Sequence, residues 1–105
     1  MCMSACPYTG VRSFNWDEPK YFLDFATGDE DAPKHQKHVV EKCTMCYHRV
    51  SRGERPACVD ICRGIARHWG DADDPNSKVS QLLATRSWKQ LLPEMGTEPN
   101  VYYLV

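Results

Sequence analysis

Cysteine is the residue type that could do chemistry in this chain, and it accounts for six of the 105 residues. Four cysteines, called the downstream cysteines below, follow the pattern C-x2-C-x11-C-x3-C at Cys43, Cys46, Cys58 and Cys62. Cys2 and Cys6 form a further C-x3-C pair, which Pro7 follows directly. Cysteines this close in sequence can turn their sulfurs toward one ion or cluster, whereas a disulfide between them is usually strained. The spacing therefore favours metal binding over disulfide bonds.

Three kinds of site are compatible with these cysteines. A secreted disulfide domain would pair all six, and a structural zinc module would use the four downstream cysteines as two knuckles. The C-x3-C-P ending at Cys6 argues instead for an iron–sulfur cluster, because ferredoxin runs end in this way. In two-cluster ferredoxins the fourth cysteine of such a run binds the other cluster. Zinc would also leave Cys2 and Cys6 without a role.

Other side chains could tune such a site without binding it. Three arginines lie in the loop between the downstream cysteines: Arg49, Arg52 and Arg55. Guanidinium groups near a negatively charged cluster would raise its potential, but a solvated basic loop is the simpler interpretation. Surface or packing roles are expected for the four histidines: His35, His38, His48 and His68. Several aromatic residues could exclude water from a cluster or simply pack: Tyr8, Trp16, Tyr47, Trp69 and Trp88.

Composition excludes several classes of protein. Lys and Arg number 13 and Asp and Glu 14, so the net charge of −1 leaves no basic excess for binding nucleic acid. No apolar run approaches the roughly 18 residues that would predict a membrane helix. The first seven residues contain a cysteine pair and no apolar region, so we expect no signal peptide.

Few secondary-structure elements are predicted around the cysteines. A Thr-Gly turn followed by β-branched and aromatic residues indicates a short strand within residues 8–16. Residues 17–38 are polar and broken by prolines and a glycine, which predicts a surface insertion with a solvated acidic tip at residues 29–31. Gly53 and Pro56 predict a loop rather than one continuous helix between the downstream cysteines.

The carboxy-terminal third contains the clearest helix signal. Val79, Leu82 and Leu83 recur at helical spacing, which predicts a helix over residues 75–86 with Asp74 as its cap and Pro75 in its first turn. The last five residues, VYYLV, are expected to be extended.

Four segments of the sequence resemble a known family. They are MCMSACPY, EKCTMCYHRVSRGERPACVDIC, GDADDPNSKVSQLLATR and LLPEMGTEPNVYYLV. They resemble the carboxy-terminal part of the four-cluster iron–sulfur subunit (beta subunit) of molybdopterin oxidoreductases. This subunit is the electron-transfer partner in dimethyl sulfoxide, polysulfide, tetrathionate and arsenate reductases.

The resemblance implies a crossed assignment of the ligands. One [4Fe–4S] cluster would be complete, bound by Cys6, Cys43, Cys46 and Cys58. A second cluster would have only two ligands in this chain, Cys2 and Cys62. Because the family's third cysteine run is represented by its last two cysteines alone, we expect the chain to be a fragment that begins inside that run.

The resemblance also implies a fold and a function. The expected fold is an α+β, ferredoxin-like iron–sulfur domain over residues 1–70, incomplete at its amino end. A carboxy-terminal tail over residues 71–105 would add a helix and an extended segment and would act as a strap or docking element. The chain would relay single electrons between a quinone-linked membrane anchor and the molybdopterin-containing catalytic subunit of an anaerobic respiratory reductase.

No catalysis is expected in the chain itself, because no nucleophile–base pair or open metal position can be assembled from its residues. It would be peripheral to the cytoplasmic membrane, without inserting into it. The resemblance does not decide on which side of the membrane the chain lies. It could be extracytoplasmic, by co-export with the catalytic subunit, or cytoplasmic.

Overall fold

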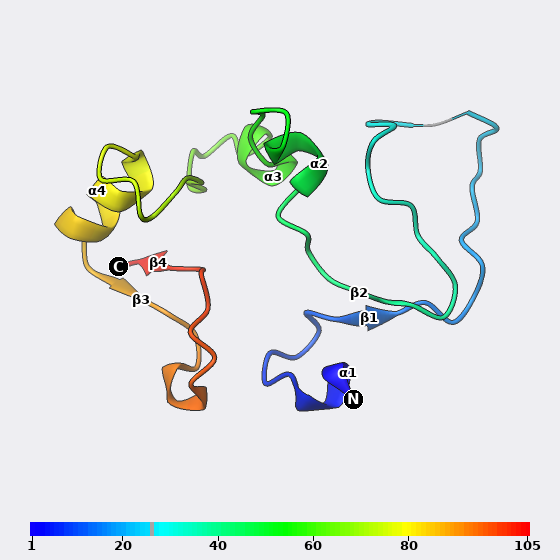
Figure 1. Cartoon of the computed structure of the whole chain (residues 1–105), viewed down its shortest axis with the longest axis horizontal. Coiled ribbons are helices and arrows are strands. Elements are labelled where there is room, and N and C mark those ends of the chain that lie inside the picture. The colour runs from blue at the N-terminus through cyan, green and yellow to red at the C-terminus, as the bar shows by residue number, and fades with distance from the viewer. Residues whose placement is uncertain (26) are drawn as a thin grey trace. The chain divides into compact units, whose positions relative to one another are not determined.

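The structure, a computed structural model, describes residues 1–25 and 27–105 as a mixture of short helices and short strands (Figure 1). The chain divides into two compact units, residues 1–57 and 58–105, and each is described by itself. This mixture agrees with the predicted α+β class at the level of its elements. The boundary predicted between the iron–sulfur domain and the carboxy-terminal tail at residue 70 stays a prediction.

The first unit begins with one helical turn. Helix α1 (Cys2–Ala5) contains a hydrogen bond from the Ala5 N–H to the Met1 carbonyl, 3.0 Å long. Cys6 follows with an extended backbone, φ −76° and ψ 121°. Pro7 explains this change, because the residue before a proline is disfavoured in the helical region.

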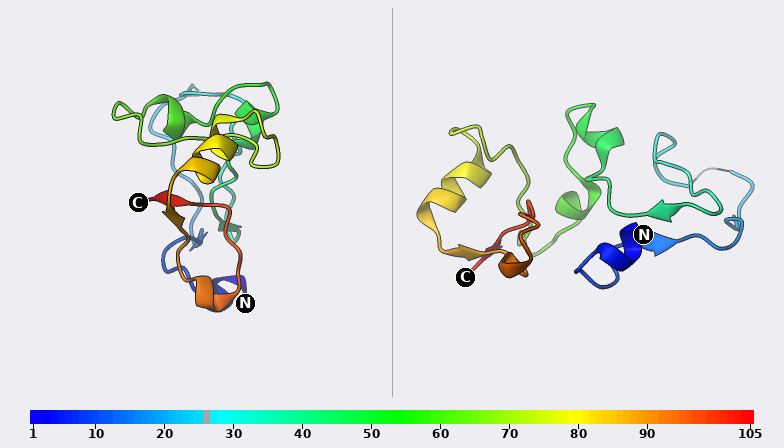
Figure 2. Two further views of the ribbon diagram at one scale, coloured as in Figure 1. Left: turned by 90° about the vertical axis from the view of Figure 1, so that its left-hand side faces the viewer. Right: turned by 60° about the horizontal axis from the view of Figure 1, so that its bottom comes forward.

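A two-residue antiparallel ladder organises the rest of this unit. Strand β1 (Ser13–Phe14) pairs with β2 (Val40–Glu41), with Ser13 opposite Glu41 and Phe14 opposite Val40 (Figures 1 and 2). The strand predicted within residues 8–16 is therefore confirmed. The turn before it has a left-handed Gly10 at φ +79°, as the Thr-Gly signal indicated.

The segment between the downstream cysteines is broken into two short helices. Helix α2 (Tyr47–Val50) ends in a turn at Gly53, whose φ of +81° suits glycine. Helix α3 (Ala57–Asp60) begins directly after Pro56, and the boundary between the two units falls at its first residue. The predicted loop at Gly53 and Pro56 is confirmed.

The second unit contains the longest helix, and its start differs from the prediction. Helix α4 spans Lys78–Thr85, and its cap is Ser77, whose hydroxyl accepts a 3.0 Å hydrogen bond from the Ser80 N–H. The predicted start at residue 75 with Asp74 as cap is wrong. The Asp74 carboxylate instead accepts from the Asn76 N–H at 2.9 Å, and this turn delays the helix.

Replacing Ser77 by alanine is expected to destabilise the second unit by about 1 kcal/mol, because the cap of α4 is lost. The Ser77 hydroxyl also donates to the Asp71 carbonyl, so the preceding turn loosens as well. Urea unfolding of the cluster-loaded chain measures the change. Ser87→Ala is the matched control, since no side-chain hydrogen bond of Ser87 is found in the described residues, and an equal loss in both variants would contradict the capping role.

The end of the chain pairs back onto the strand that follows α4. Strand β3 (Trp88–Lys89) pairs antiparallel with β4 (Tyr103–Leu104), and the 3₁₀ helix η1 (Pro93–Met95) lies between them in sequence. The Trp88 indole N–H donates to the Leu83 carbonyl at 3.2 Å, and its ring meets Tyr102 edge to face. The expectation of an extended carboxy terminus is confirmed.

Neither unit has a packed hydrophobic core. Across residues 1–25 and 27–105 no apolar side chain other than that of Pro56 is buried, and Phe22 is 98% exposed. Small domains without a sufficient core are stabilised by metals or disulfides. All six cysteines are free, so they are available as metal ligands.

No helix in the described part of the chain is both long enough and apolar enough to cross a membrane.

Candidate metal centre

The candidate ligands are six free thiols distributed over the two units. Cys6 and Cys46 are half-buried in the first unit, where Cys2 and Cys43 are exposed. In the second unit Cys58 is exposed and lies on α3, while Cys62 is half-buried just beyond it.

The β1–β2 ladder links the segment that follows Cys6 to the segment that precedes Cys43. Because the strands are antiparallel, the start of β1 lies beside the end of β2, with Ser13 opposite Glu41. The segment from Cys6 enters β1 at this end, and the segment to Cys43 leaves β2 there (Figure 1). Segments that are far apart in sequence and carry two candidate ligands are therefore joined through one structural element.

The C-x2-C loop has an unusual backbone. Met45 and Cys46 are both left-handed, at φ +57° and +50°, a conformation that is rare outside glycine. The Met45 N–H points at the Cys43 sulfur, with a nitrogen–sulfur distance of 3.4 Å. A backbone N–H aimed at a cysteine sulfur is a contact that a metal-bound thiolate also accepts, so this loop is compatible with a ligand at Cys43.

The backbone that follows Cys62 lowers the pKa of its thiol. Hydrogen bonding from the Ala66 N–H is the largest cause that lowers the pKa of the Cys62 thiol, with further contributions from the Arg67 and Gly64 N–H groups. Partial burial opposes this shift, and the positive charge of Arg67 assists it. The residues after Cys62 therefore favour the thiolate, which is the form that binds metal.

The donor set fits a thiolate-bound cluster. The candidate ligands are all free thiols, the Met45 N–H faces the Cys43 sulfur, and backbone hydrogen bonding lowers the pKa of Cys62. Neither unit, within its described residues, contains three or more Cys, His, Asp or Glu side chains already placed to hold a metal ion. The structure thus gives the local conformation around each cysteine, and the grouping of ligands remains a prediction.

The acidic tip of the insertion differs from the prediction. Asp29 and Asp31 were expected to be solvated, but both contact Arg52 in the loop after Cys46. Hydrogen bonding from Arg52 is the main cause that lowers the pKa of Asp29, and hydrogen bonding to Asp29 is the main cause that raises the pKa of Arg52. The prediction failed because a contact between residues so far apart in sequence leaves no local pattern.

Arg49 is also engaged, so the three arginines do not form a uniformly solvated basic loop. The Arg49 Nε–H donates to the Arg55 carbonyl at 2.9 Å, and Nε lies 3.5 Å from a Glu54 carboxylate oxygen. The side chain of Arg49 thereby spans the turn that contains Gly53.

The histidines have the roles expected of surface and packing residues. His35 Nδ1 lies 2.7 Å from a Glu41 carboxylate oxygen, and this contact is the main cause that lowers the pKa of Glu41. The ring of His38 stacks on Phe14, and His48 Nε2 lies 3.7 Å from a carboxylate oxygen of Asp29. His68 is exposed.

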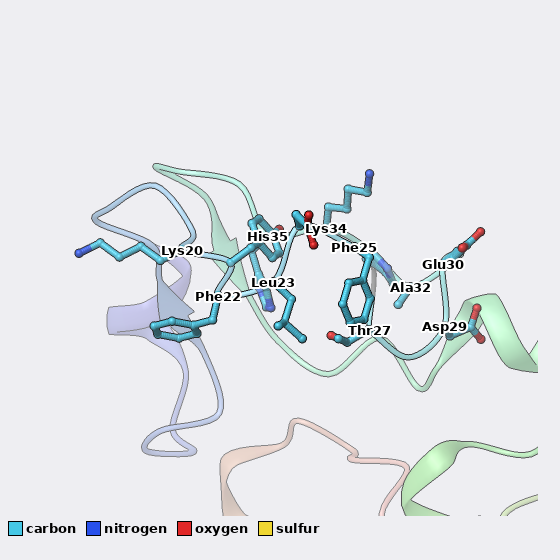
Figure 3. A pocket seen from close by; sticks show the side chains of 13 residues that line it. Lys20, Phe22, Leu23, Phe25, Thr27, Asp29, Glu30, Ala32, Lys34 and His35 are labelled. Carbon is cyan, nitrogen blue, oxygen red and sulfur yellow. The ribbon is translucent and has the colours of Figure 1, made fainter.

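An open hollow lies within the insertion and is separate from the cysteines. Phe22, Leu23 and Phe25 are among the residues that line it, together with Asp29 and His35. Leu23 and Phe25 lie near its middle, while Phe22 points away to one side (Figure 3). No cysteine lines it. The hollow therefore contributes no ligand to the candidate metal centre.

Comparison with known proteins identifies the class of this metal centre. A family model described as "4Fe-4S dicluster domain" matches residues 30–72, a range that contains all four downstream cysteines. The chain is also 50% identical, over 98% of its length, to an iron–sulfur protein of Halobacterium salinarum that is named as a component of dimethyl sulfoxide reductase. It is 39% identical to the arsenate respiratory reductase iron–sulfur subunit ArrB of a Shewanella species, and 37% identical to a tetrathionate reductase subunit of Salmonella typhimurium.

These matches confirm the resemblance to the iron–sulfur subunits of molybdopterin oxidoreductases. The last two alignments also cover 98% of the chain, which spans 38%, 56% and 34% of the three relatives in the order given. The cofactor of the chain is a [4Fe–4S] cluster. A zinc module on the downstream cysteines is not favoured, because those cysteines fall inside the dicluster match.

Proposed function

We propose that the chain relays single electrons within a reductase complex and performs no substrate chemistry of its own. The observation that carries this proposal is the set of six free thiols, arranged in the spacing of cluster ligands and inside or beside a 4Fe-4S dicluster match. The chain's relatives are named as iron–sulfur subunits of reductases, which supports a role as an electron-transfer component.

The proposed ligands of the complete cluster are Cys6, Cys43, Cys46 and Cys58. Cys2 and Cys62 are proposed to contribute to a second cluster, whose remaining ligands lie outside this chain. The β1–β2 ladder supports the assignment of Cys6, because it brings the segment from Cys6 and the segment to Cys43 to one end of the same element.

The residues of the chain have distinct tasks in this function. The bound cluster supplies reversible one-electron chemistry. The four thiolates hold it, and the Met45 N–H helps to disperse charge at the Cys43 sulfur. Burial, hydrogen bonds and nearby charge set the potential at which the electron is accepted and released.

The wider setting is proposed from the family resemblance of the sequence. The catalytic partner would be a molybdopterin-containing subunit, and a membrane anchor would exchange electrons with quinone. The chain would adopt a ferredoxin-like fold over residues 1–70 and use residues 71–105 as a strap or docking element. It would be peripheral to the membrane within this complex.

Anaerobically purified chain is expected to be brown and to contain about four irons and four sulfides, since one site has four cysteines. A broad absorption near 400 nm, roughly the position of thiolate-to-iron charge transfer, would accompany them. Iron and sulfide analysis with a visible spectrum tests the proposal. A colourless chain with one zinc would contradict it, and about eight irons per chain would contradict the assignment of a single complete site.

A further inference from the structure

A contact between the insertion and the loop after Cys46 stands out in the first unit. One nitrogen of the Arg52 guanidinium lies 2.6 Å from Asp29 Oδ2, and another lies 2.5 Å from Asp31 Oδ2 and 3.4 Å from Asp29 Oδ1. Arg52 therefore binds both oxygens of Asp29 while also reaching Asp31. We call this contact the Arg52 clamp.

The clamp is a network rather than an isolated surface pair. Arg52 also contacts Glu54 at 3.3 Å, and the Asp31 N–H donates to Asp29 Oδ1 at 3.0 Å, so the carboxylates are held in place from their own side. Single exposed ion pairs contribute little, but bidentate arginine–carboxylate pairs and charge networks are the exceptions. Asp29 is itself only 26% exposed in its side chain.

The loop that the clamp holds is the one that leads from Cys46 to Cys58. Within this loop the Glu54 N–H donates to the Arg49 carbonyl at 3.0 Å, and the Arg49 side chain donates to the Arg55 carbonyl, so hydrogen bonds connect the two sides of the turn. The clamp fixes this turn to the insertion, whose far end is fixed to β2 by His35 and Glu41.

We propose that Arg52 and Asp29 are positioning residues for the iron–sulfur site: the clamp fixes the loop between two cluster ligands and neutralises the charge of Arg52. The inference rests on the proposed ligand roles of Cys46 and Cys58. The insertion is then a part of the cluster-binding apparatus rather than a surface loop without a role. Hydrogen-bond partners outside the ligand set commonly affect metal retention strongly.

The test compares variants of the full chain, purified anaerobically with its cluster. Asp29→Asn should lose the cluster to a chelator roughly tenfold faster than wild type, as expected for loss of a supporting contact. Glu30→Gln is the matched control, because it removes the same charge from the same tip, while Glu30 has no contact with Arg52 in the described residues. Its cluster should be retained as in wild type.

A double-mutant cycle separates the effect of holding the loop in place from the effect of the charges of Arg52 and Asp29. Arg52→Gln should lose the cluster at least as fast as Asp29→Asn, because it also removes the contacts with Asp31 and Glu54. The double variant should lose it no faster than Arg52→Gln, since the Asp29 contact is already absent there. The midpoint potential should rise in Asp29→Asn, fall in Arg52→Gln and return close to wild type in the double variant, because negative charge disfavours the reduced cluster. Should Arg52→Gln fail to fold, Arg52→Lys is the alternative, because it keeps the positive charge but lacks the bidentate guanidinium group. This variant should lose the cluster at an intermediate rate and keep the wild-type midpoint potential.

Equal rates of cluster loss in Asp29→Asn and Glu30→Gln would overturn the inference, as would wild-type retention in the double variant. Either result would show that only the overall charge matters. A wild-type chain without the charge-transfer band would instead overturn the proposed function itself, so the two failures are distinguishable.

Discussion

Replacing Cys6 by alanine is expected to remove the same [4Fe–4S] cluster that is lost when Cys43 is replaced by alanine. A cubane cluster needs four thiolates, so loss of one should lower the iron content from about four per chain to below about one. The β1–β2 ladder gives the physical reason for pairing residues so far apart in sequence, because it delivers both segments to one end of the ladder. Iron analysis and the visible spectrum of each anaerobically purified variant provide the measurement.

Cys62→Ala and Cys2→Ala serve as controls, because both residues are assigned to the second cluster. These variants should keep the iron content and spectrum of wild type. A Cys6 variant with a normal spectrum, together with a Cys62 variant that has lost it, would show that the four downstream cysteines bind one cluster locally. The crossed assignment would then be wrong for this chain.

Removing the cluster is expected to unfold most of the chain. The reason is the absence of buried apolar side chains other than Pro56 among the described residues, which leaves little free energy of folding without bound metal. Anaerobic treatment with an iron chelator should abolish the cooperative thermal transition and most of the helical circular dichroism signal. Reassembly of the cluster from iron and sulfide should restore both.

The matched control is a sample of the chain that has been exposed to the chelator but has kept its iron. A chain that has lost its iron but still melts in the same sharp transition at the same temperature would show that it is stable without metal. The role assigned to the cluster in folding would then be wrong.

Local signals in the sequence predicted the elements that depend on neighbouring residues. The Thr-Gly turn indicated the strand at Ser13–Phe14, and Gly53 and Pro56 predicted the break between α2 and α3. The helix near residue 80 was located correctly but not its start. Asp74 and Ser77 are both good caps, and only the structure shows that Asp74 forms a turn of its own with Asn76.

Features that depend on distant residues could not be predicted in this way. The Arg52 clamp joins residues more than 20 positions apart, so the local sequence alone predicts a solvated acidic tip. Cysteine spacing predicted the six candidate ligands, but the lowered pKa of Cys62 depends on the path of the backbone after it, which no side-chain pattern encodes. The left-handed backbone of Met45 and Cys46 could not be predicted from the sequence either, because neither residue type indicates this conformation.

The β1–β2 ladder also bears on how this chain can diverge in length. It closes the two ends of the insertion against each other, at Phe14 and Val40. Doubling the length of a flexible loop adds only about 0.6 kcal/mol of closure entropy. Mutation can therefore lengthen or shorten residues 17–28 while the cysteine segments still enter and leave the opposite end of the ladder. If Asp29 and Asp31 are retained, this stretch is the natural place for insertions to accumulate, and the place where an engineer could graft an affinity tag.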